Sequence, residues 1–201
     1  NRLTEARSEF EGAITLDPNL ANGWLGRGLI RIRTGDSAGG RQDLKAAAVL
    51  EPERSLLRSY LGKVYASTGD ATRANEEFTR AQKLDASDPV PWLYSALEKS
   101  EENRINEAVD DLEKSIALNG NRAVYRSRLL LDEDLAVRSA NLAAIYREAG
   151  LTDVSVSEAS KAITSDYANY TAHLFLANSY NDLRDPNLIN LRYETATISE
   201  Y

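Results

Sequence analysis

The chain has 201 residues with a formal net charge of −7, and it contains neither cysteine nor methionine. The acidic balance argues against binding of nucleic acid, which needs clustered Lys and Arg, and the lack of cysteine excludes disulfides and thiolate metal sites. No apolar run approaches the roughly 20 residues of a membrane-spanning helix, so we expect no direct membrane insertion. Because position 1 is not methionine, we expect the sequence to be part of a longer protein.

A 34-residue period runs through the first two thirds of the chain. Small residues recur at this interval, and so do large apolar ones: Ala13, Ala47, Ala81 and Ser115 form the first series, and Phe10, Leu44, Phe78 and Leu112 form the second. A unit of this length cannot bury its own apolar face and must stack on its neighbours. The period therefore predicts a solenoid of repeats.

Each period predicts two amphipathic helices joined by a short turn. Apolar residues recur at helical spacing in four segments, which are 24–33, 42–50, 57–67 and 73–84. A Gly-Asp pair follows each first helix, and we expect the glycine to end that helix and the aspartate to cap the next one. These pairs are Gly35-Asp36 and Gly69-Asp70, and Pro52 ends the second segment because proline cannot continue a helix.

These residues resemble the tetratricopeptide repeat (TPR), whose pattern places Trp, Leu, Gly, Tyr, Ala, Phe, Ala and Pro at set positions. The repeat of residues 55–88 matches best, with Leu61, Gly62, Tyr65, Ala74, Phe78 and Ala81. The preceding repeat has Arg31 where Tyr is usual, and the following one has Ser115 and Gly120 in the last two places. The resemblance implies an all-α, right-handed superhelical solenoid of antiparallel helix pairs.

The repeat pattern divides the chain into seven segments and contains one insertion. The expected segments are the second helix of a truncated repeat (1–18), full repeats at 21–54, 55–88, 89–122 and 136–169, an insertion at 123–135, and a partial repeat with a C-terminal segment at 170–201. The insertion follows from Tyr65 and Tyr146, which lie two periods and 13 residues apart. No Gly or Pro interrupts residues 121–149, so one long helix is possible there. We favour an irregular or short helical linker, with Asp132 as a candidate cap for a fresh helix.

The insertion also contains a candidate secondary contact, formed by Tyr125, Arg126 and Arg128. Guanidinium groups bind the carboxylates or phosphates of a partner. In the competing and favoured interpretation, the arginines pair with the acidic run from Asp132 to Asp134, which lacks the ligand pattern of a calcium loop.

No catalytic constellation is evident, and we predict neither enzyme activity nor a cofactor. The chain has one histidine, His173, at a place where the family usually has Trp on the buried side of a first helix. We expect it to be a core or half-buried residue. One histidine and no cysteine provide no credible ligand set for zinc.

The resemblance implies a groove lined by the second, fifth, ninth, twelfth and thirteenth places of each first helix. The candidate partner-binding residues are Asn22, Leu25, Leu29, Ile32, Arg33, Lys63, Leu93, Leu97, Arg147 and Asn178. Other residues at these places include Ser59, Val90, Ser100, Glu101, Ala140, Ala144 and Glu148. A clamp for a C-terminal carboxylate is disfavoured because Leu25 and Leu29 stand where Lys and Asn are needed. The leucines suit an apolar strip of a peptide or helix, or they pack against neighbouring helices.

The resemblance implies a noncatalytic protein–protein interaction scaffold that binds a peptide or protein segment. A second resemblance suggests an alternative: residues 121–146 are similar to a stretch of large bacterial proteins in which such repeats precede an outer-membrane β-barrel. That similarity implies a structural spacer or polymer-guiding segment of an envelope assembly. It slightly favours the bacterial periplasm or an outer-membrane association over the cytoplasm.

Overall fold

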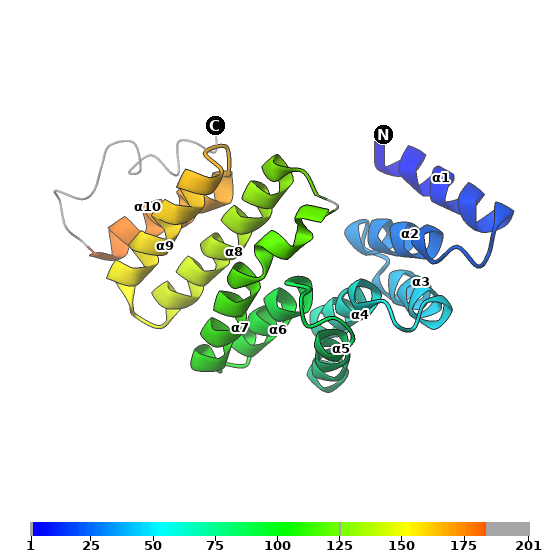
Figure 1. The fold of residues 1–201 in the computed structure, drawn as a ribbon, viewed down its shortest axis with the longest axis horizontal. Coiled ribbons are helices and arrows are strands. Elements are labelled where there is room, and N and C mark those ends of the chain that lie inside the picture. The colour runs from blue at the N-terminus through cyan, green and yellow to red at the C-terminus, as the bar shows by residue number, and fades with distance from the viewer. Residues whose placement is uncertain (1, 125, 184–201) are drawn as a thin grey trace. The chain divides into compact units, whose positions relative to one another are not determined.

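A computed structural model describes residues 2–124 and 126–183 of the chain (Figure 1). These residues form ten α-helices and one 3₁₀ helix, and adjacent helices pack in pairs. The prediction of an all-α solenoid of helix pairs is therefore confirmed. The chain divides into two compact units, unit 1 (Asn1–Tyr94) and unit 2 (Ser95–Tyr201).

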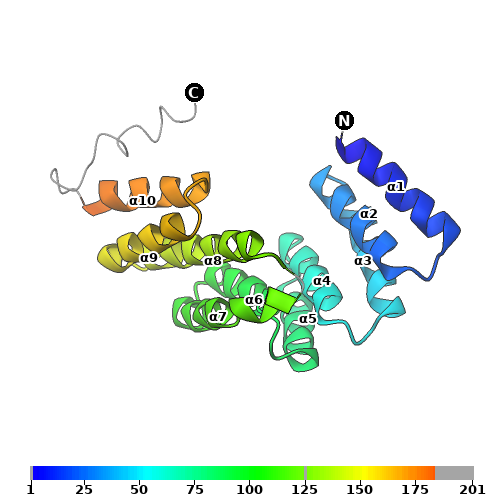
Figure 2. The same ribbon diagram turned by 45° about the horizontal axis from the view of Figure 1, so that its top comes forward.

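The division between the units falls inside α6 (Val90–Glu101). Unit 1 also contains α1 (Arg2–Leu16), α2 (Ala21–Arg33), α3 (Ser37–Leu50), α4 (Ser55–Ser67) and α5 (Ala71–Leu84). Unit 2 contains α7 (Ile105–Ala117), the 3₁₀ helix η1 (Asn119–Val124), α8 (Arg128–Glu148), α9 (Thr152–Ser165) and α10 (Tyr170–Leu183). In unit 1, α2 packs on α3 and α4 on α5. In unit 2, α8, α9 and α10 contact one another and lie side by side in Figure 2.

The predicted turn chemistry is present at both Gly-Asp pairs. Gly35 and Gly69 have φ angles of 95° and 77°, in the left-handed region that favours glycine. The Asp36 carboxylate accepts a hydrogen bond from the Gly39 amide at 2.8 Å, and the Asp70 carboxylate caps α5 in the same way. The helices begin two to five residues before the predicted apolar segments, and most of the added residues are small or polar.

The core of unit 1 forms around the large apolar residues of the period. Leu44 and Phe78 are 0% and 1% exposed. A Cβ atom on Gly62 would lie 2.5 Å from the Phe78 ring, so only glycine lets α4 and α5 approach this closely. The small residue and the aromatic residue of the repeat pattern therefore fit each other across the helix pair.

An acidic residue occupies the same place of the second helix in three successive repeats, as Asp43, Glu77 and Asp111. Arg27 donates two hydrogen bonds to the buried Asp43 carboxylate, at 2.8 and 2.7 Å. The other ion pairs at this place are Arg31–Asp43, Arg58–Glu77 and Lys99–Asp111. Arg31 and Lys99 stand where the repeat pattern has Tyr. These two substitutions provide the cations that pair with Asp43 and Asp111.

The predicted insertion is partly helical. Residues 128–135 form the first two turns of α8, and η1 precedes them. The candidate cap Asp132 is wrong: Ser127 is the N-cap residue, because its backbone is extended and its hydroxyl accepts from the Leu130 amide at 3.4 Å. Asp132 lies inside the helix.

Hydrogen bonds around Arg138 and Asp134 tie the insertion to its neighbours. The Asp134 carboxylate accepts from Arg122 and Arg126, at 3.1 and 2.9 Å, as the favoured interpretation of the insertion predicts. Arg138 is 2% exposed and donates to Ser115 Oγ, Asn119 Oδ1 and the Asp134 carbonyl. One buried guanidinium thus joins α7, η1 and α8.

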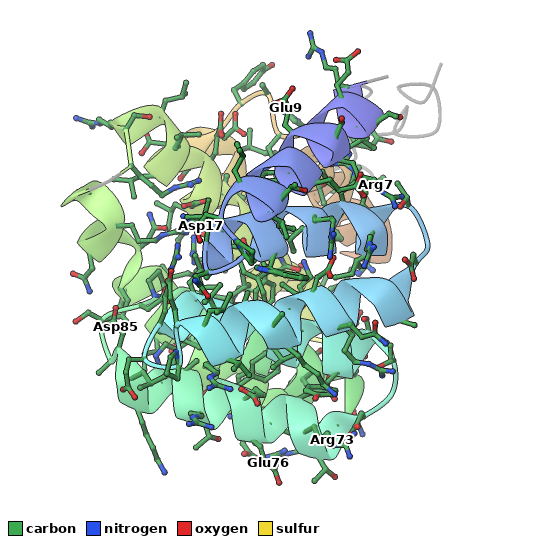
Figure 3. All side chains as sticks on the ribbon, turned by 90° about the vertical axis from the view of Figure 1, so that its right-hand side faces the viewer. Arg7, Glu9, Asp17, Arg73, Glu76 and Asp85 are labelled. Carbon is green, nitrogen blue, oxygen red and sulfur yellow. The ribbon has the colours of Figure 1, made fainter. Side chains whose placement is uncertain are left out.

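Unit 1 exposes polar residues, and also the apolar Leu16 and Val49. Figure 3 labels Glu9 on α1 and Arg73 and Glu76 on α5, all of which are exposed. Polar residues on the outside and apolar ones between the helices are the amphipathic pattern that the sequence predicts. Tyr125 and the stretch 184–201 lie outside the described residues.

Candidate functional site

The candidate groove residues of α2 divide into exposed and core-packing side chains. Asn22 is exposed and accepts a hydrogen bond from Arg54 at 2.8 Å, and Arg33 is also exposed. Leu25 and Ile32 are half-buried and pack against the core cluster of unit 1. For these two residues the alternative of packing on neighbouring helices is therefore confirmed. Leu29 is half-buried.

Aromatic residues lie beside the candidate residue Lys63 of α4. The Lys63 ammonium is 4.8 Å from the centroid of the Tyr94 ring, within the range of a cation–π interaction. The rings of Tyr60 and Tyr94 have centroids 6.0 Å apart. Leu93 is half-buried. Tyr60 and Tyr94 occupy the sixth place of their repeats, which the family's list of ligand-facing places omits.

Three other places implied by the resemblance are buried. Ser59 is 0% exposed, and its hydroxyl donates to the Ser55 carbonyl of the same helix. Val90 and Ala140 are 6% and 2% exposed. The prediction that these three side chains face a partner is wrong, because the small side chains of Ser59 and Ala140 allow close helix packing and Val90 lies at a buried helix start.

Unit 2 contains a hollow of about 240 Å³ between α6 and α8. Its lining residues are Leu97, Ser100 and Glu101 from α6, and Asn141, Ala144, Ile145 and Glu148 from α8. Five of these seven stand at the places that the resemblance assigns to a ligand, namely Leu97, Ser100, Glu101, Ala144 and Glu148. The structure therefore brings together candidate residues from two repeats that the insertion separates in the sequence.

The hollow combines an apolar floor with an acidic rim. Leu97, Ala144 and Ile145 supply aliphatic surface, whereas Glu101 and Glu148 are exposed carboxylates. Sequence reasoning missed Asn141 and Ile145, which occupy the sixth and tenth places of their repeat. The sixth place holds Gly26, Tyr60, Tyr94 and Asn141, so no shared chemistry in the period marked it.

The remaining candidates lie outside this hollow. Arg147 and Asn178 are half-buried and do not line it. Of the candidate secondary contact, Arg126 pairs with Asp134, Arg128 is exposed, and Tyr125 falls outside the described residues.

His173 is half-buried, as expected. Its Nε2 atom lies 2.9 Å from the Tyr167 carbonyl oxygen, and its ring meets the Tyr167 ring edge-on with centroids 5.2 Å apart. These contacts give the histidine a structural role at the start of α10. Across residues 2–124 and 126–183, no group of three or more His, Asp or Glu side chains could hold a metal ion. None of the helices in these ranges combines the length and the apolar character that crossing a membrane requires.

Comparison with known proteins places the chain among helical-repeat structures. No model of a protein family matches it. It is similar to the crystal structure of the APC/C hetero-tetramer Cut9–Hcn1, with a TM-score of 0.84 and 21% identity over 100% of this chain and 38% of that one. It is also similar to PilW, a type IV pilus biogenesis factor, with a TM-score of 0.79 and 14% identity over 99% of this chain and 87% of that one. The chain has the tetratricopeptide-repeat fold.

A sequence relative of the TPR array is anaphase-promoting complex subunit 3 of Schizosaccharomyces pombe, which is 28% identical over 81 residues. That match covers 40% of the array and 12% of the relative. The array therefore spans a small part of the relative's length. These comparisons therefore establish the fold of the chain.

Proposed function

We propose that this TPR array is a noncatalytic scaffold that binds a peptide or protein segment in the hollow between α6 and α8. The observation that carries the proposal is the lining of the hollow, in which five of seven residues stand at the ligand-facing places of the repeat. The places that the resemblance implies and the lining of the hollow therefore support the same surface.

The size of the hollow supports a macromolecular partner. Its volume of about 240 Å³ is below the roughly 300–1,000 Å³ typical of small-molecule pockets. Leu97 and Ile145 give it an apolar floor, onto which an aliphatic side chain of a bound segment fits. The neighbour Cut9 is solved in a hetero-tetramer with Hcn1, so this fold takes part in a protein assembly there.

A peptide library tests the proposal. The full 201-residue chain is used to select binders from a displayed library of about 12-residue peptides, and the binders are then measured against Leu97→Asp. Because the carboxylate removes the apolar floor, we expect at least a tenfold loss of affinity, or about 1.4 kcal/mol. Val154→Asp is the matched control, since Val154 is an exposed apolar residue of α9 that does not line the hollow. Equal affinity of wild type and a folded Leu97→Asp variant would contradict the proposal.

The alternative is a bacterial envelope segment that guides a polymer or acts as a spacer. It draws on the similarity to PilW, a type IV pilus biogenesis factor, and on the second sequence resemblance. This alternative predicts the opposite result: immobilised oligosaccharides retain the chain, and selection from the peptide library yields no binders.

A further inference from the structure

We propose that the hollow between α6 and α8 selects a basic partner segment, in which Lys or Arg residues flank an apolar residue. The inference rests on the proposed function and adds the chemistry of the partner. It follows from the charges around the hollow rather than from its shape.

The rim carries two carboxylates without a counter-ion in the described chain. Glu101 and Glu148 both line the hollow and both are exposed. Within residues 2–124 and 126–183, neither side chain forms a hydrogen bond or an ion pair. Two like charges over an apolar floor favour a ligand of the opposite sign.

Each of these glutamates is the last residue of its helix, Glu101 in α6 and Glu148 in α8. The C-terminal end of a helix carries a partial negative charge, which favours cations and disfavours carboxylates. Neither glutamate therefore stabilises its own helix. The two helix ends instead add to the negative potential that the carboxylates create at the rim.

Glu98 lies on the same turn of α6 but does not line the hollow. It is 6% exposed and stands at the tenth place of its repeat, where other repeats have Ile30, Val64 and Ile145. Burial, followed by the charges of Glu101 and Glu102, raises the pKa of the Glu98 carboxyl. No side chain in the described ranges donates a hydrogen bond to it.

The cations near this turn are engaged elsewhere. Lys99 pairs with the buried Asp111, and Arg104 pairs with Glu102 and Glu107. Arg147 precedes Glu148 in α8 but does not line the hollow, and it has interactions of its own. A Lys or Arg side chain of the partner is therefore the counter-ion that fits this rim.

Three sets of synthetic peptides of about 11 residues test the proposal with the full chain. All sets share a randomised centre of Leu, Ile, Val and Ala, and they differ only in flanking residues, which are Lys, Gln or Glu. We expect the Lys set to bind at least ten times more tightly than the Gln set and the Glu set to bind most weakly. The preference should weaken as salt rises above about 0.15 M, because exposed charges are screened.

Two variants with equal net charge locate the preference. Glu101→Gln/Glu148→Gln should reduce the affinity for the Lys set to that for the Gln set and leave the Gln set unchanged. Asp110→Asn/Asp153→Asn removes two exposed carboxylates of unit 2 that do not line the hollow, so it should retain the full preference. Thermal unfolding by circular dichroism verifies that both variants fold.

The outcomes separate this inference from the proposed function. Equal affinity for all three sets, or a Lys preference that survives Glu101→Gln/Glu148→Gln, overturns the basic partner. If Leu97→Asp still abolishes binding in that case, the groove function stands without it. Failure of all three sets to bind overturns the basic partner, whereas the groove function then depends on whether the displayed library yields binders. Retention of a cationic chitosan oligosaccharide alone assigns the rim to a glycan instead of a protein.

Discussion

Unit 1 closes its helix pairs around large side chains, whereas the cluster where α8, α9 and α10 of unit 2 meet consists mainly of alanines. In unit 1, Leu44, Leu57 and Phe78 are at most 1% exposed. In unit 2, the cluster contains Ala140, Ala143, Ala159, Ala162 and Ala172 together with Ile163 and Leu176. Helix pairs of this fold therefore pack closely in two ways: large side chains fill the space between the helices, or small side chains let the helix backbones approach.

Both units pair a cation with the acidic place of the period, as Arg27–Asp43 and Lys99–Asp111, but unit 2 also has a buried guanidinium at the insertion. In unit 1, a bidentate pair between Arg27 and Asp43 connects the two helices of one repeat. In unit 2, Arg138 bonds to three neutral acceptors and bridges the break in the period. The comparison teaches that the insertion is stabilised by polar contacts at the point where regular apolar stacking is interrupted.

The largest expected effect is truncation of the unit 1 core. Phe78→Ala should destabilise the protein by about 4 kcal/mol, because it removes a buried ring and leaves a cavity beside Gly62. Urea unfolding measures the loss, and hydrogen exchange should show it in α4 and α5. Val49→Ala, at a position that is 77% exposed, should change stability by less than about 0.5 kcal/mol. A Phe78→Ala loss below about 1 kcal/mol would contradict the described core.

Removal of the bridge at the insertion should have the next largest effect. Arg138→Ala removes the buried guanidinium that donates to Ser115 and Asn119, which should cost about 3 kcal/mol. Hydrogen exchange should accelerate first in α7, η1 and the start of α8. Arg128→Ala, an exposed arginine of the same helix, is the control. Unchanged exchange at the insertion would show that the bridge does not stabilise it.

A larger side chain in the alanine-rich cluster of unit 2 should destabilise the protein. Ala159 is 0% exposed, so Ala159→Leu forces α9 away from its neighbours and should cost about 2 kcal/mol. Ser157→Leu, on the exposed side of the same helix, should be close to neutral. Equal stability of the two variants in urea would mean that the cluster has room that the structure does not show.

The smallest effect should come from Glu98, and it depends on pH. Because the folded state raises the pKa of Glu98 through burial and through Glu101 and Glu102, folding favours the protonated carboxyl. Stability therefore falls as pH rises through the interval between the unfolded and folded pKa values. Glu98→Gln should raise Tm by about 1–2 °C at neutral pH, and the gain should vanish at acidic pH.

A second glutamate offers a control of opposite sign. The hydrogen bond from Arg104 lowers the pKa of Glu107, so Glu107 stabilises the fold at neutral pH and loses this effect as pH falls. Glu107→Gln should therefore lower Tm slightly at neutral pH. Calorimetric scans over pH 3–8 distinguish the two glutamates, and the same trend in both variants would refute the assignment for Glu98.

Most of the fold could be predicted because its determinants are local. The 34-residue period places Leu44 and Phe78 in the core, and the Gly-Asp pairs mark the turns that the structure contains. The helix starts were predicted too late because the expected segments began at a large or central residue of the apolar stripe and left out the residues just before it, such as Ala21 and Leu56. The cap of α8 was misassigned because Ser127 and Asp132 are both good caps, and only the backbone conformation chooses between them.

The candidate site was less predictable from the residues alone. The family's places predicted Leu97 and Ala144 as ligand-facing, and both residues line the hollow. The same places also predicted Ser59 and Ala140, which are buried. A place in the repeat specifies a helix face, but the size of the side chain and the tilt of its neighbour decide whether that face is open.

The sequence by itself determined the helix pairs, the turns, the small and large core places and the absence of a carboxylate-clamp pattern, since each depends on residues within one or two periods. Only the tertiary structure decided that Arg138 reaches Ser115, that Arg31 and Lys99 pair with the acidic place, and that α6 and α8 enclose the acid-rimmed hollow. The physical reason is that these contacts join side chains on different helices. Whether such side chains meet depends on how the helices pack, and the repeat spacing does not determine that packing.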